Sequence, residues 1–330
     1  MTREITQSDW RPHASWTVLR KRAQMLRMAR EYFFTQEVLE VETPMLSAAA
    51  VTDPHIESFA TYYEGPGVVN KHSMYLHSSP EFPMKRLLAA GSGAIYQICK
   101  VFRNGECGQK HNPEFTMIEW YRPGFNLQGM MDDVERLVRY LLCIEGIACE
   151  RVSYEELFSR YLGFDPHTAS FKVLYAAVNQ AGLNVAGLHD DDRDACLNLL
   201  LTHIIEPQLG QDGMCFVYDY PASQAALAQL RHDETAVAER FELYMNGCEL
   251  ANGYLELRDS NELSQRMQQD LVFRQKESTG AVSADAHLLA AMAHGFPACS
   301  GVALGFDRLV MLAVGAKVLD EVLAFPFARA

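Results

Sequence analysis

The pattern of apolar and polar residues near the N-terminus predicts one long amphipathic helix followed by a strand. Over residues 15–34, Leu19, Leu26 and Phe33 recur at helical spacing, while arginines and lysines occupy the rest of the wheel. Residues 38–46 then alternate apolar and polar side chains until a proline interrupts them. We therefore expect a helix, a strand and a turn in that order.

Two β-rich segments further along predict a long antiparallel hairpin. Residues 94–102 and 113–122 are rich in β-branched and aromatic side chains, and a polar loop containing glycine joins them. Because side chains alternate along a strand, four residues of the second segment share one face. They are Phe115, Met117, Glu119 and Tyr121.

The middle of the chain, about 125–210, predicts a helical insert between β-rich parts. Apolar residues recur at helical spacing over 129–143, and the segment from Asp190 to Ile205 is again helical in pattern. Ser153 and Glu156 have the spacing of a capping box, which marks the start of a further helix.

The strand pattern resumes after this insert. Residues 215–220 and a hairpin-like pair over 240–257 are β-rich, and the segment 299–316 predicts a strand, a tight glycine turn and a helix. Strands interrupted by long helical stretches favour an α+β fold with a mixed, mainly antiparallel sheet over a doubly wound one.

Composition narrows the classes of function. Lys+Arg number 29 against Asp+Glu 42, a formal charge of −13, which opposes binding of a nucleic-acid backbone as the main role. No apolar run is long enough for a transmembrane helix, and no signal peptide is visible, so we expect a cytoplasmic protein. The eight cysteines form no C-x-x-C pair and are interpreted as buried free thiols. Metal chemistry, if present, should use carboxylates and phosphate oxygens.

Three segments carry candidate chemistry: VETPML (41–46), VFRNGECGQKHNPEFTMIEW (101–120) and GVALGFDRL (301–309). In the second segment, the planar fork of Arg103 suits a phosphate, and Phe115 on the return strand suits stacking on a base. In the third, small residues allow a ligand to approach the backbone, and Arg308 follows on the first turn of a helix. Each segment alone also fits an ordinary strand, surface hairpin or strand-to-helix turn.

Together, and in this order, the three segments resemble motifs 1, 2 and 3 of the class II aminoacyl-tRNA synthetases. The chain more closely resembles the catalytic domain of lysyl-tRNA synthetase, from about Ser15 to the C-terminus and most weakly over 125–210. The segments that carry this likeness are HNPEFTMIEWY (111–121), RFELYMNGCELANGYLEL (240–257), SSPE (78–81) and GVALGFDRL. The resemblance implies a sheet of about six to seven antiparallel strands flanked by helices, and a homodimer formed through the motif 1 helix.

Lysyl-tRNA synthetase carries an OB-fold anticodon-binding domain of roughly 100 residues or more before motif 1. Only about 14 residues precede the predicted motif 1 helix here. We therefore expect a single class II synthetase-like catalytic domain over 1–330, with no anticodon-binding domain and no tRNA partner. This organisation resembles the family of truncated lysyl-tRNA synthetase paralogues that attach (R)-β-lysine to a lysine of translation elongation factor P. The resemblance implies an ATP-dependent, AMP-forming ligase that modifies a translation factor after its synthesis.

A substrate with two ammonium groups needs a carboxylate for each group if it is to leave water at low cost. By resemblance, Ser79, Pro80 and Glu81 lie toward the reacting end of the amino acid, and Tyr121 and Asn252 flank it. Glu119 and Glu256 receive the side-chain amine. A single glutamate would be interpreted as a solvated surface charge, but three in matching motifs favour a diamine site.

For ATP, the resemblance implies that Arg103 holds the α-phosphate and Arg308 the γ-phosphate of a bent nucleotide, which makes these arginines the catalytic residues. Glu242 and Glu249 are implied as the carboxylates that hold Mg²⁺, a hard cation that bridges phosphates. Charge that develops on the phosphoryl group is then stabilised without a covalent enzyme nucleophile. The residues implied around the base and its loop are Asn104, Gly105, Asn112, Phe115, Leu250 and Gly305.

The chain departs from the synthetase pattern at two places. Ala303 occupies the middle position of a motif that commonly reads G-x-G-x-G, and its methyl group reshapes the amino-acid pocket in a way that favours a β-amino acid over α-lysine. Gly105 stands where motif 2 usually has a glutamate, and Glu106 follows one residue later. The usual contact to the adenine amino group is therefore not assigned.

Two alternatives to the protein ligase stay open at this point. One is a small enzyme that charges lysyl-tRNA without an anticodon domain. The other is a catalytically silent paralogue that senses an amino acid and regulates another enzyme. Loss of Arg103, Arg308 or the two metal carboxylates would favour the silent paralogue. All four residues are present, so catalysis is preferred.

Overall fold

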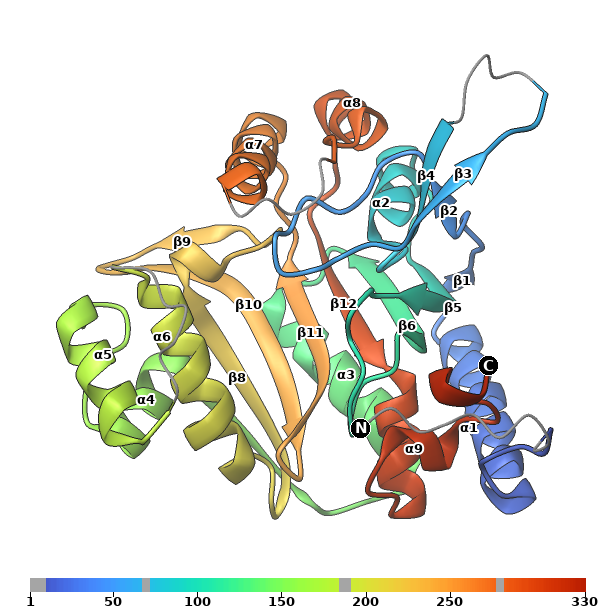
Figure 1. Cartoon of the computed structure of the whole chain (residues 1–330), viewed down its shortest axis with the longest axis horizontal. Coiled ribbons are helices and arrows are strands. Elements are labelled where there is room, and N and C mark those ends of the chain that lie inside the picture. The colour runs from blue at the N-terminus through green and yellow to red at the C-terminus, as the bar shows by residue number, and fades with distance from the viewer. Residues whose placement is uncertain (1–9, 67–71, 184–190, 277–281) are drawn as a thin grey trace.

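A mixed sheet of nine strands forms the centre of the computed structural model, which describes residues 10–66, 72–183, 191–276 and 282–330 (Figure 1). Alternating side chains give the sheet two faces, and helices pack on both. In spatial order the strands are β1 (Leu39–Glu40), β5 (Ile95–Phe102), β6 (Glu114–Pro123), β12 (Cys299–Gly305), β11 (Cys248–Leu255), β10 (Ala236–Met245), β8 (Gly213–Pro221) and β7 (Ala148–Ser153), with β9 (Leu230–His232) paired to β10 beside this path.

The six strands from β5 to β8 pair antiparallel throughout, whereas the outermost pairs, β1 with β5 and β7 with β8, are parallel. This arrangement confirms the predicted α+β fold and the hairpin formed by β5 and β6. The parallel edges were not predicted. In particular, β7 lies inside the stretch that the sequence predicts to be helical. Its pattern is short and polar and one side of it is exposed, so it was not predicted as a strand.

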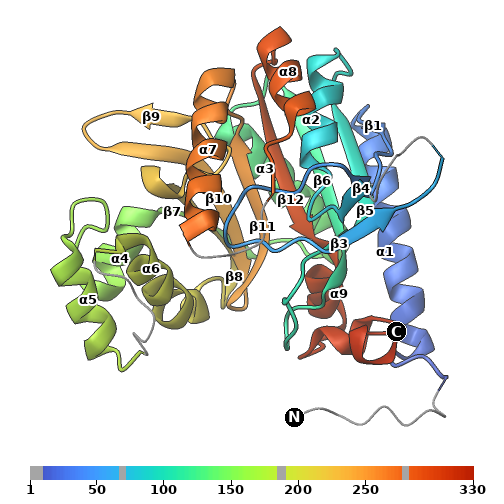
Figure 2. The same cartoon turned by 45° about the horizontal axis from the view of Figure 1, so that its top comes forward.

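The strand predicted from residue 38 up to Pro44 is wrong for most of its length. Only Leu39–Glu40 pairs with the edge of the large sheet. The chain then leaves this edge, and Leu46–Ser47 joins a separate small sheet in which β2 (Leu46–Ser47), β4 (His72–Leu76) and β3 (Ala60–Tyr63) lie in that order. The loop between β2 and β3 crosses the face of the large sheet over β12 (Figures 1 and 2).

One face of the sheet is covered by α1 (Trp16–Thr35), α3 (Leu127–Leu142) and α9 (Phe306–Val314). The N-terminal helix is confirmed, and the Ser15 side chain caps it by accepting a hydrogen bond from the Val18 backbone N–H. Its buried side is centred on Met25, Ala29 and Phe33, so the predicted apolar face is rotated: Leu19 and Leu26 are only half-buried. At the other end of the chain, β12 runs directly into α9 with no separate glycine turn.

Helices α2 (Glu81–Ala89), α7 (Ser260–Lys276) and α8 (Ala286–His294) pack on the opposite side of the sheet, at its upper end in Figure 1. The sequence pattern did not predict them. Helix α7 buries few apolar side chains, and α2 is short and carries Pro83 in its first turn, where proline is tolerated.

Within the insert predicted over about 125–210, α3 confirms the helix expected over 129–143 and belongs to the core of the large sheet. The rest of the insert contains the helices α4 (Tyr154–Leu162), α5 (Phe171–Gln180) and α6 (Arg193–Leu200), and a π-helical turn at Leu201–Ile205. These helices form their own apolar cluster beside β7 and β8, on the left in Figure 2. The capping box of Ser153 and Glu156 is confirmed at the start of α4. Asp190 lies outside the described residues.

All eight cysteines are free, as predicted, but only four are buried; Cys107 and Cys143 are exposed. Throughout the described ranges, no helix has both the length and the apolar character needed to cross a membrane.

Candidate active site

A cavity of about 410 Å³ opens on the face of the sheet opposite α1, α3 and α9. The alternation along β6 decides which residues reach it. Ile118 and Trp120 point into the core formed with α1 and α3, whereas Met117, Glu119 and Tyr121 line the cavity. The shared face predicted for β6 is therefore confirmed. Strands β10, β11 and β12 supply the rest of the floor.

Glu119 lies at one end of the cavity with its carboxylate held from two sides. Ser79 Oγ donates to Glu119 Oε2 at 2.7 Å, and the Tyr121 hydroxyl donates to Glu119 Oε1 at 2.6 Å. Burial, together with the nearby charge of Glu81, raises the pKa of Glu119 to about 8. Its proton is therefore easily displaced by a bound cation near neutral pH.

Lys85 joins the other two carboxylates at this end. Its ammonium lies 2.7 Å from Glu81 Oε1 and 2.7 Å from Glu256 Oε2, and the side chain is only 2% exposed. Burial opposes the charged form, but the carboxylates of Glu256 and Glu81 outweigh it and raise the pKa of Lys85. Burial raises the pKa of Glu256 to about 7, although the positive charge of Lys85 opposes that shift. Sequence reasoning missed Lys85, yet its position four residues after Glu81 on one helix was an available signal.

The charges at this end have a simple sum. Glu81, Glu119 and Glu256 carry three negative charges when ionised, and Lys85 carries one positive charge, so −3 + 1 leaves −2. Two net negative charges in a buried pocket match a ligand with two ammonium groups. Gly301 packs so closely against this group that no side chain fits at its position: a Cβ there would lie 2.3 Å from Glu256 Oε1 and 2.4 Å from the Tyr121 ring.

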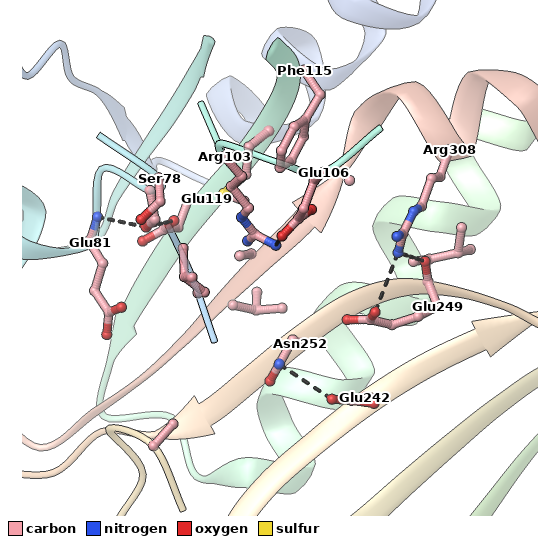
Figure 3. A pocket seen from close by; sticks show the side chains of 18 of the residues that line it. Ser78, Glu81, Arg103, Glu106, Phe115, Glu119, Glu242, Glu249, Asn252 and Arg308 are labelled. Atoms are coloured by element: carbon pink, nitrogen blue, oxygen red, sulfur yellow. Dashed lines mark hydrogen bonds and ion pairs between the residues drawn. The ribbon is translucent and has the colours of Figure 1, made fainter. Parts of the chain in front are cut away.

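The opposite end of the cavity is cationic and aromatic (Figure 3). The Arg103 guanidinium lies over the Phe115 ring, 5.2 Å from its centroid, and its Nη1 is 3.6 Å from Glu106 Oε1. Arg308 Nη1 donates to the Glu249 carbonyl oxygen at 2.8 Å and lies 3.3 Å from Glu249 Oε2. This end therefore offers two planar cations and one ring face to a phosphorylated, aromatic ligand.

Glu242 lies between the two ends, on β10. The hydroxyls of Tyr220 and Tyr244 donate to its Oε2, and the guanidinium of Arg240 lies 2.5 Å from its Oε1. Glu249 follows on β11. Two carboxylates beside Arg240 and Arg308 are hard oxygen donors of the kind that Mg²⁺ takes. Within the described ranges, no cluster of three or more metal-ligating side chains is present.

Most of the predicted site residues meet in this cavity. Those that line it are Ser79, Glu81, Arg103, Asn112, Phe115, Glu119, Tyr121, Glu242, Glu249, Leu250, Asn252, Glu256, Ala303, Gly305 and Arg308.

Pro80, Asn104 and Gly105 do not line it. Pro80 is the residue before α2, and the Asn104 backbone N–H donates to the Glu57 carbonyl oxygen at 2.8 Å. Gly105 has a φ of +82°, a conformation that favours glycine, and Glu106 after it faces the cavity instead. The displaced motif 2 glutamate is thus present in the site, one position later.

Sequence reasoning missed a further group of lining residues. Asp53 and Ile56 come from the loop between β2 and β3, which Arg274 of α7 holds by donating to the Asp53 carbonyl oxygen at 2.9 Å. Glu206 does not line the cavity itself; it accepts a hydrogen bond from the Tyr244 hydroxyl at 3.3 Å, and burial and then the charge of Glu242 raise its pKa to about 7. Only the tertiary structure brings these residues to the sheet, because no motif spacing links them. The other missed lining residues include Ser78, Lys110, His111, Arg240, Tyr254 and Gly301.

The model of a protein family described as "tRNA synthetases class II (D, K and N)" matches residues 5–329. The chain belongs to this family. The first motif segment, residues 41–46, follows α1 and β1; the second lies on the β5–β6 hairpin and the third on β12 with α9, and β6 and β12 are neighbours in the sheet.

Curated relatives place this class II synthetase more narrowly. It is 48% identical over 321 residues to the elongation factor P–(R)-β-lysine ligase of Pseudoalteromonas translucida, covering 97% of this chain and 98% of that protein. It is 47% identical over 323 residues to the ligase of the same name from Yersinia enterocolitica, covering 98% and 99%. The corresponding protein of Vibrio cholerae is 47% identical over 326 residues, covering 99% of this chain and all of that one.

Proposed function

We propose that this protein activates (R)-β-lysine with ATP and transfers the acyl group to a lysine side chain of translation elongation factor P. The observation that carries this proposal is the buried group of three glutamates and Lys85, whose net charge of −2 matches the two ammonium groups of a diamino acid. The names of its relatives, which align over nearly their whole lengths, support the same activity.

In the proposed complex, the two ammonium groups of the amino acid lie among Glu81, Glu119 and Glu256, and its carboxylate points toward Arg103. Each glutamate is already held by a neighbour, so little side-chain freedom is lost on binding. Ala303, which lines this part of the cavity, narrows it relative to a glycine and favours the amine on the β-carbon.

ATP occupies the other end, with its adenine on Phe115 and its phosphates between Arg103 and Arg308. Glu242 and Glu249 would hold Mg²⁺, which withdraws charge from the phosphate oxygens when bound. Tyr220, Tyr244 and Arg240 keep the Glu242 carboxylate in one orientation by hydrogen bonding to it.

The first step is an in-line displacement at phosphorus. A carboxylate oxygen of the amino acid attacks the α-phosphorus, the bond to the bridging oxygen of the β-phosphate breaks, and pyrophosphate leaves with the electron pair. Arg103 offers its planar fork to the α-phosphate oxygens, where charge develops. Arg308 holds the departing phosphates.

The second step is acyl transfer. A neutral lysine amine of the acceptor attacks the acyl carbon, the C–O bond to the phosphate of AMP breaks, and AMP leaves with the electron pair. The entering ammonium loses two protons in all, one before the attack and one after it, and both pass to solvent. No covalent enzyme intermediate is needed.

Amino-acid-dependent ATP–pyrophosphate exchange tests the proposal, with (R)-β-lysine, (S)-β-lysine and α-lysine compared. We expect strong exchange with (R)-β-lysine, reduced at least about 100-fold by Arg308→Ala, because one charge-stabilising donor is worth about this much. The matched control is Arg258→Ala, an exposed arginine outside the cavity, which should exchange at the wild-type rate.

Two results would replace the proposal with its alternatives. A clear preference for α-lysine, with acyl transfer to tRNA and not to elongation factor P, would indicate a small tRNA-charging enzyme. Exchange with none of the three amino acids would indicate an amino-acid sensor. The joint presence of Arg103, Arg308, Glu242 and Glu249 in one cavity supports catalysis over sensing.

We further propose that the chain acts as one catalytic domain, without tRNA or membrane, as a homodimer that meets through α1. The exposed Trp16 and Phe34 of this helix, 67% and 82% accessible, support such a contact. Because the proposed acceptor is a translation factor, the proposed location is the cytoplasm.

A further inference from the structure

A second cavity, of about 360 Å³, lies against the first. Both volumes are in the range of ligand sites in proteins, roughly 300–1,000 Å³. The two cavities share Val51, Ser78, Ser79 and Glu81, so a single wall of side chains separates them. The rest of the second cavity is built by the loop after β2, the N-terminal half of α2 and the start of α8.

The shared wall belongs to the amino-acid end of the first cavity. There, Ser79 donates a hydrogen bond to a buried carboxylate, and Glu81 is itself one of the carboxylates. Phe115 and Arg308, at the nucleotide end, line only the first cavity. Once an aminoacyl-adenylate fills the first cavity from end to end, a second reactant must approach its acyl carbon from the side, and the second cavity adjoins the amino-acid part of that side.

The walls of the second cavity suit a long, thin cationic side chain. Small residues, among them Ala48, Ala50 and Ala286, leave the space open. Glu81 and Asp285 contribute two carboxylates, and the guanidinium of Arg86 and the imidazole of His287 also line it.

His77 adds no positive charge to this wall. Its Nε2 lies 2.7 Å from the Lys100 carbonyl oxygen, which can only accept, so Nε2 carries the hydrogen. Burial lowers the pKa of His77, which keeps the ring neutral at pH 7. The ring of His77 therefore does not oppose a lysine ammonium.

We propose that the second cavity is the acceptor route: the lysine side chain of the protein substrate enters through it and reaches the acyl carbon at the Ser78–Glu81 wall. This inference rests on the proposed function, because it assigns a place to the second substrate of that reaction. It divides the enzyme into an adenylating cavity, which ATP and the amino acid fill, and a side cavity that only the acceptor uses.

The test fills the second cavity and measures the two half-reactions separately. Ala48→Phe and Ala286→Phe place a ring in it from two different elements, and both alanines are exposed, so the fold should tolerate them. The matched control is Ala293→Phe, seven residues further along α8 and outside the lining, about 10 Å away along the helix.

We expect (R)-β-lysine-dependent ATP–pyrophosphate exchange within about twofold of wild type in all three variants. Single-turnover transfer from the enzyme-bound adenylate to elongation factor P should fall at least tenfold in Ala48→Phe and Ala286→Phe, and stay unchanged in Ala293→Phe. Hydroxylamine is small enough to pass a narrowed route, so its reaction with the adenylate should be unaffected in every variant.

Three outcomes would overturn the acceptor route. Wild-type transfer rates in both filled variants would show that the acceptor approaches from elsewhere. A tenfold rise in the KM for (R)-β-lysine would show that the cavity admits the amino acid instead. Absence of exchange in the wild-type protein would overturn the proposed function itself, and this outcome does not depend on any of the variants.

Discussion

The ammonium of Lys85 lies between Glu81 and Glu256 with almost no exposed surface. Separating such a pair is costly, because a charge left alone in a buried place has neither water nor a partner. Lys85 reaches no further than the two carboxylates, so it acts through them as a positioning residue. Its contribution is to hold two of the three glutamates in place and to keep the pocket at two negative charges.

Replacing Lys85 with methionine should lower the free energy of unfolding by about 3 kcal/mol or more, and raise the KM for (R)-β-lysine at least tenfold. Denaturant unfolding and pyrophosphate exchange measure the two effects. Lys100→Met is the control, because its ion pair with Glu114, 3.4 Å long, is exposed and should be worth no more than about 1 kcal/mol.

Should Lys85→Met fail to fold, the double variant Lys85→Met with Glu256→Gln restores the net charge of −2 without a buried unpaired carboxylate. We expect it to be more stable than the single variant. An unchanged KM in Lys85→Met, or a double variant that is less stable than the single one, would contradict the role given to Lys85.

Glu119 and Glu256 also predict a pH dependence. Their pKa values of about 8 and about 7 mean that the empty pocket holds protons below pH 7, and a diammonium ligand must displace them. The KM for (R)-β-lysine should therefore fall about tenfold or more between pH 6 and pH 8, while the KM for ATP changes little. The groups that face these carboxylates are Ser79, Glu81, Lys85 and Tyr121.

The same shifts act on stability with a definite sign. A raised carboxyl pKa means that the folded protein binds more protons than the unfolded chain from about pH 4.5 to pH 8. The contribution of Glu119 to the free energy of unfolding is therefore largest below this window and decreases as pH rises through it. A KM for (R)-β-lysine that stays constant from pH 6 to pH 8 would count against the shifted carboxyls.

At the scale of elements, one ion pair connects α1 with the segments that carry Phe115 and Arg308. Arg22 Nη1 of α1 lies 2.5 Å from Asp307 Oδ1, and its Nη2 donates to Thr116 Oγ1 at 2.7 Å. Asp307 Oδ2 in turn accepts from the Thr116 backbone N–H at 2.9 Å. Because Thr116 follows Phe115 and Asp307 precedes Arg308, this contact sets how the ring and the arginine stand toward each other.

Arg22→Ala should raise the KM for ATP about tenfold, leave the KM for (R)-β-lysine within about twofold of wild type, and lower the Tm. Initial-rate exchange kinetics separate the two constants, and Arg22→Lys should recover part of the loss by keeping the charge. Arg20→Ala, exposed on the same helix, serves as the control. Equal rises in both KM values would indicate general damage and not positioning of the nucleotide end.

For the whole molecule, the sheet serves two purposes through its two faces. One face packs against α1, α3 and α9 in the largest apolar cluster, and the other carries the cavity. Helices α4, α5 and α6 have their own core beside β7 and β8, and none of the described residues between 125 and 210 lines the cavity. Rigid strands therefore position the reacting groups, while the insert stays at one edge.

The sequence by itself determined the elements whose signal is local. The helix at Trp16–Thr35, the hairpin of β5 and β6, the capping box at Ser153 and the shared face of Met117, Glu119 and Tyr121 follow from periodicity and capping between near neighbours. Arg103 and Arg308 were identified from a different local signal, the residue types within short motif segments.

The tertiary structure decided what depends on distant partners. The strand predicted from residue 38 up to Pro44 is cut short because the chain changes sheets, and the polar β7 pairs only because β8 is beside it. Asp53 reaches the cavity from a loop, Lys85 lies beside it on a helix and Glu206 beside it in the insert, and no spacing along the chain links them. The burial of Lys85 and of the carboxyls around it, and with it the net charge and the proton affinity of the site, exists only once the sheet has assembled, because water screens the same charges in the unfolded chain.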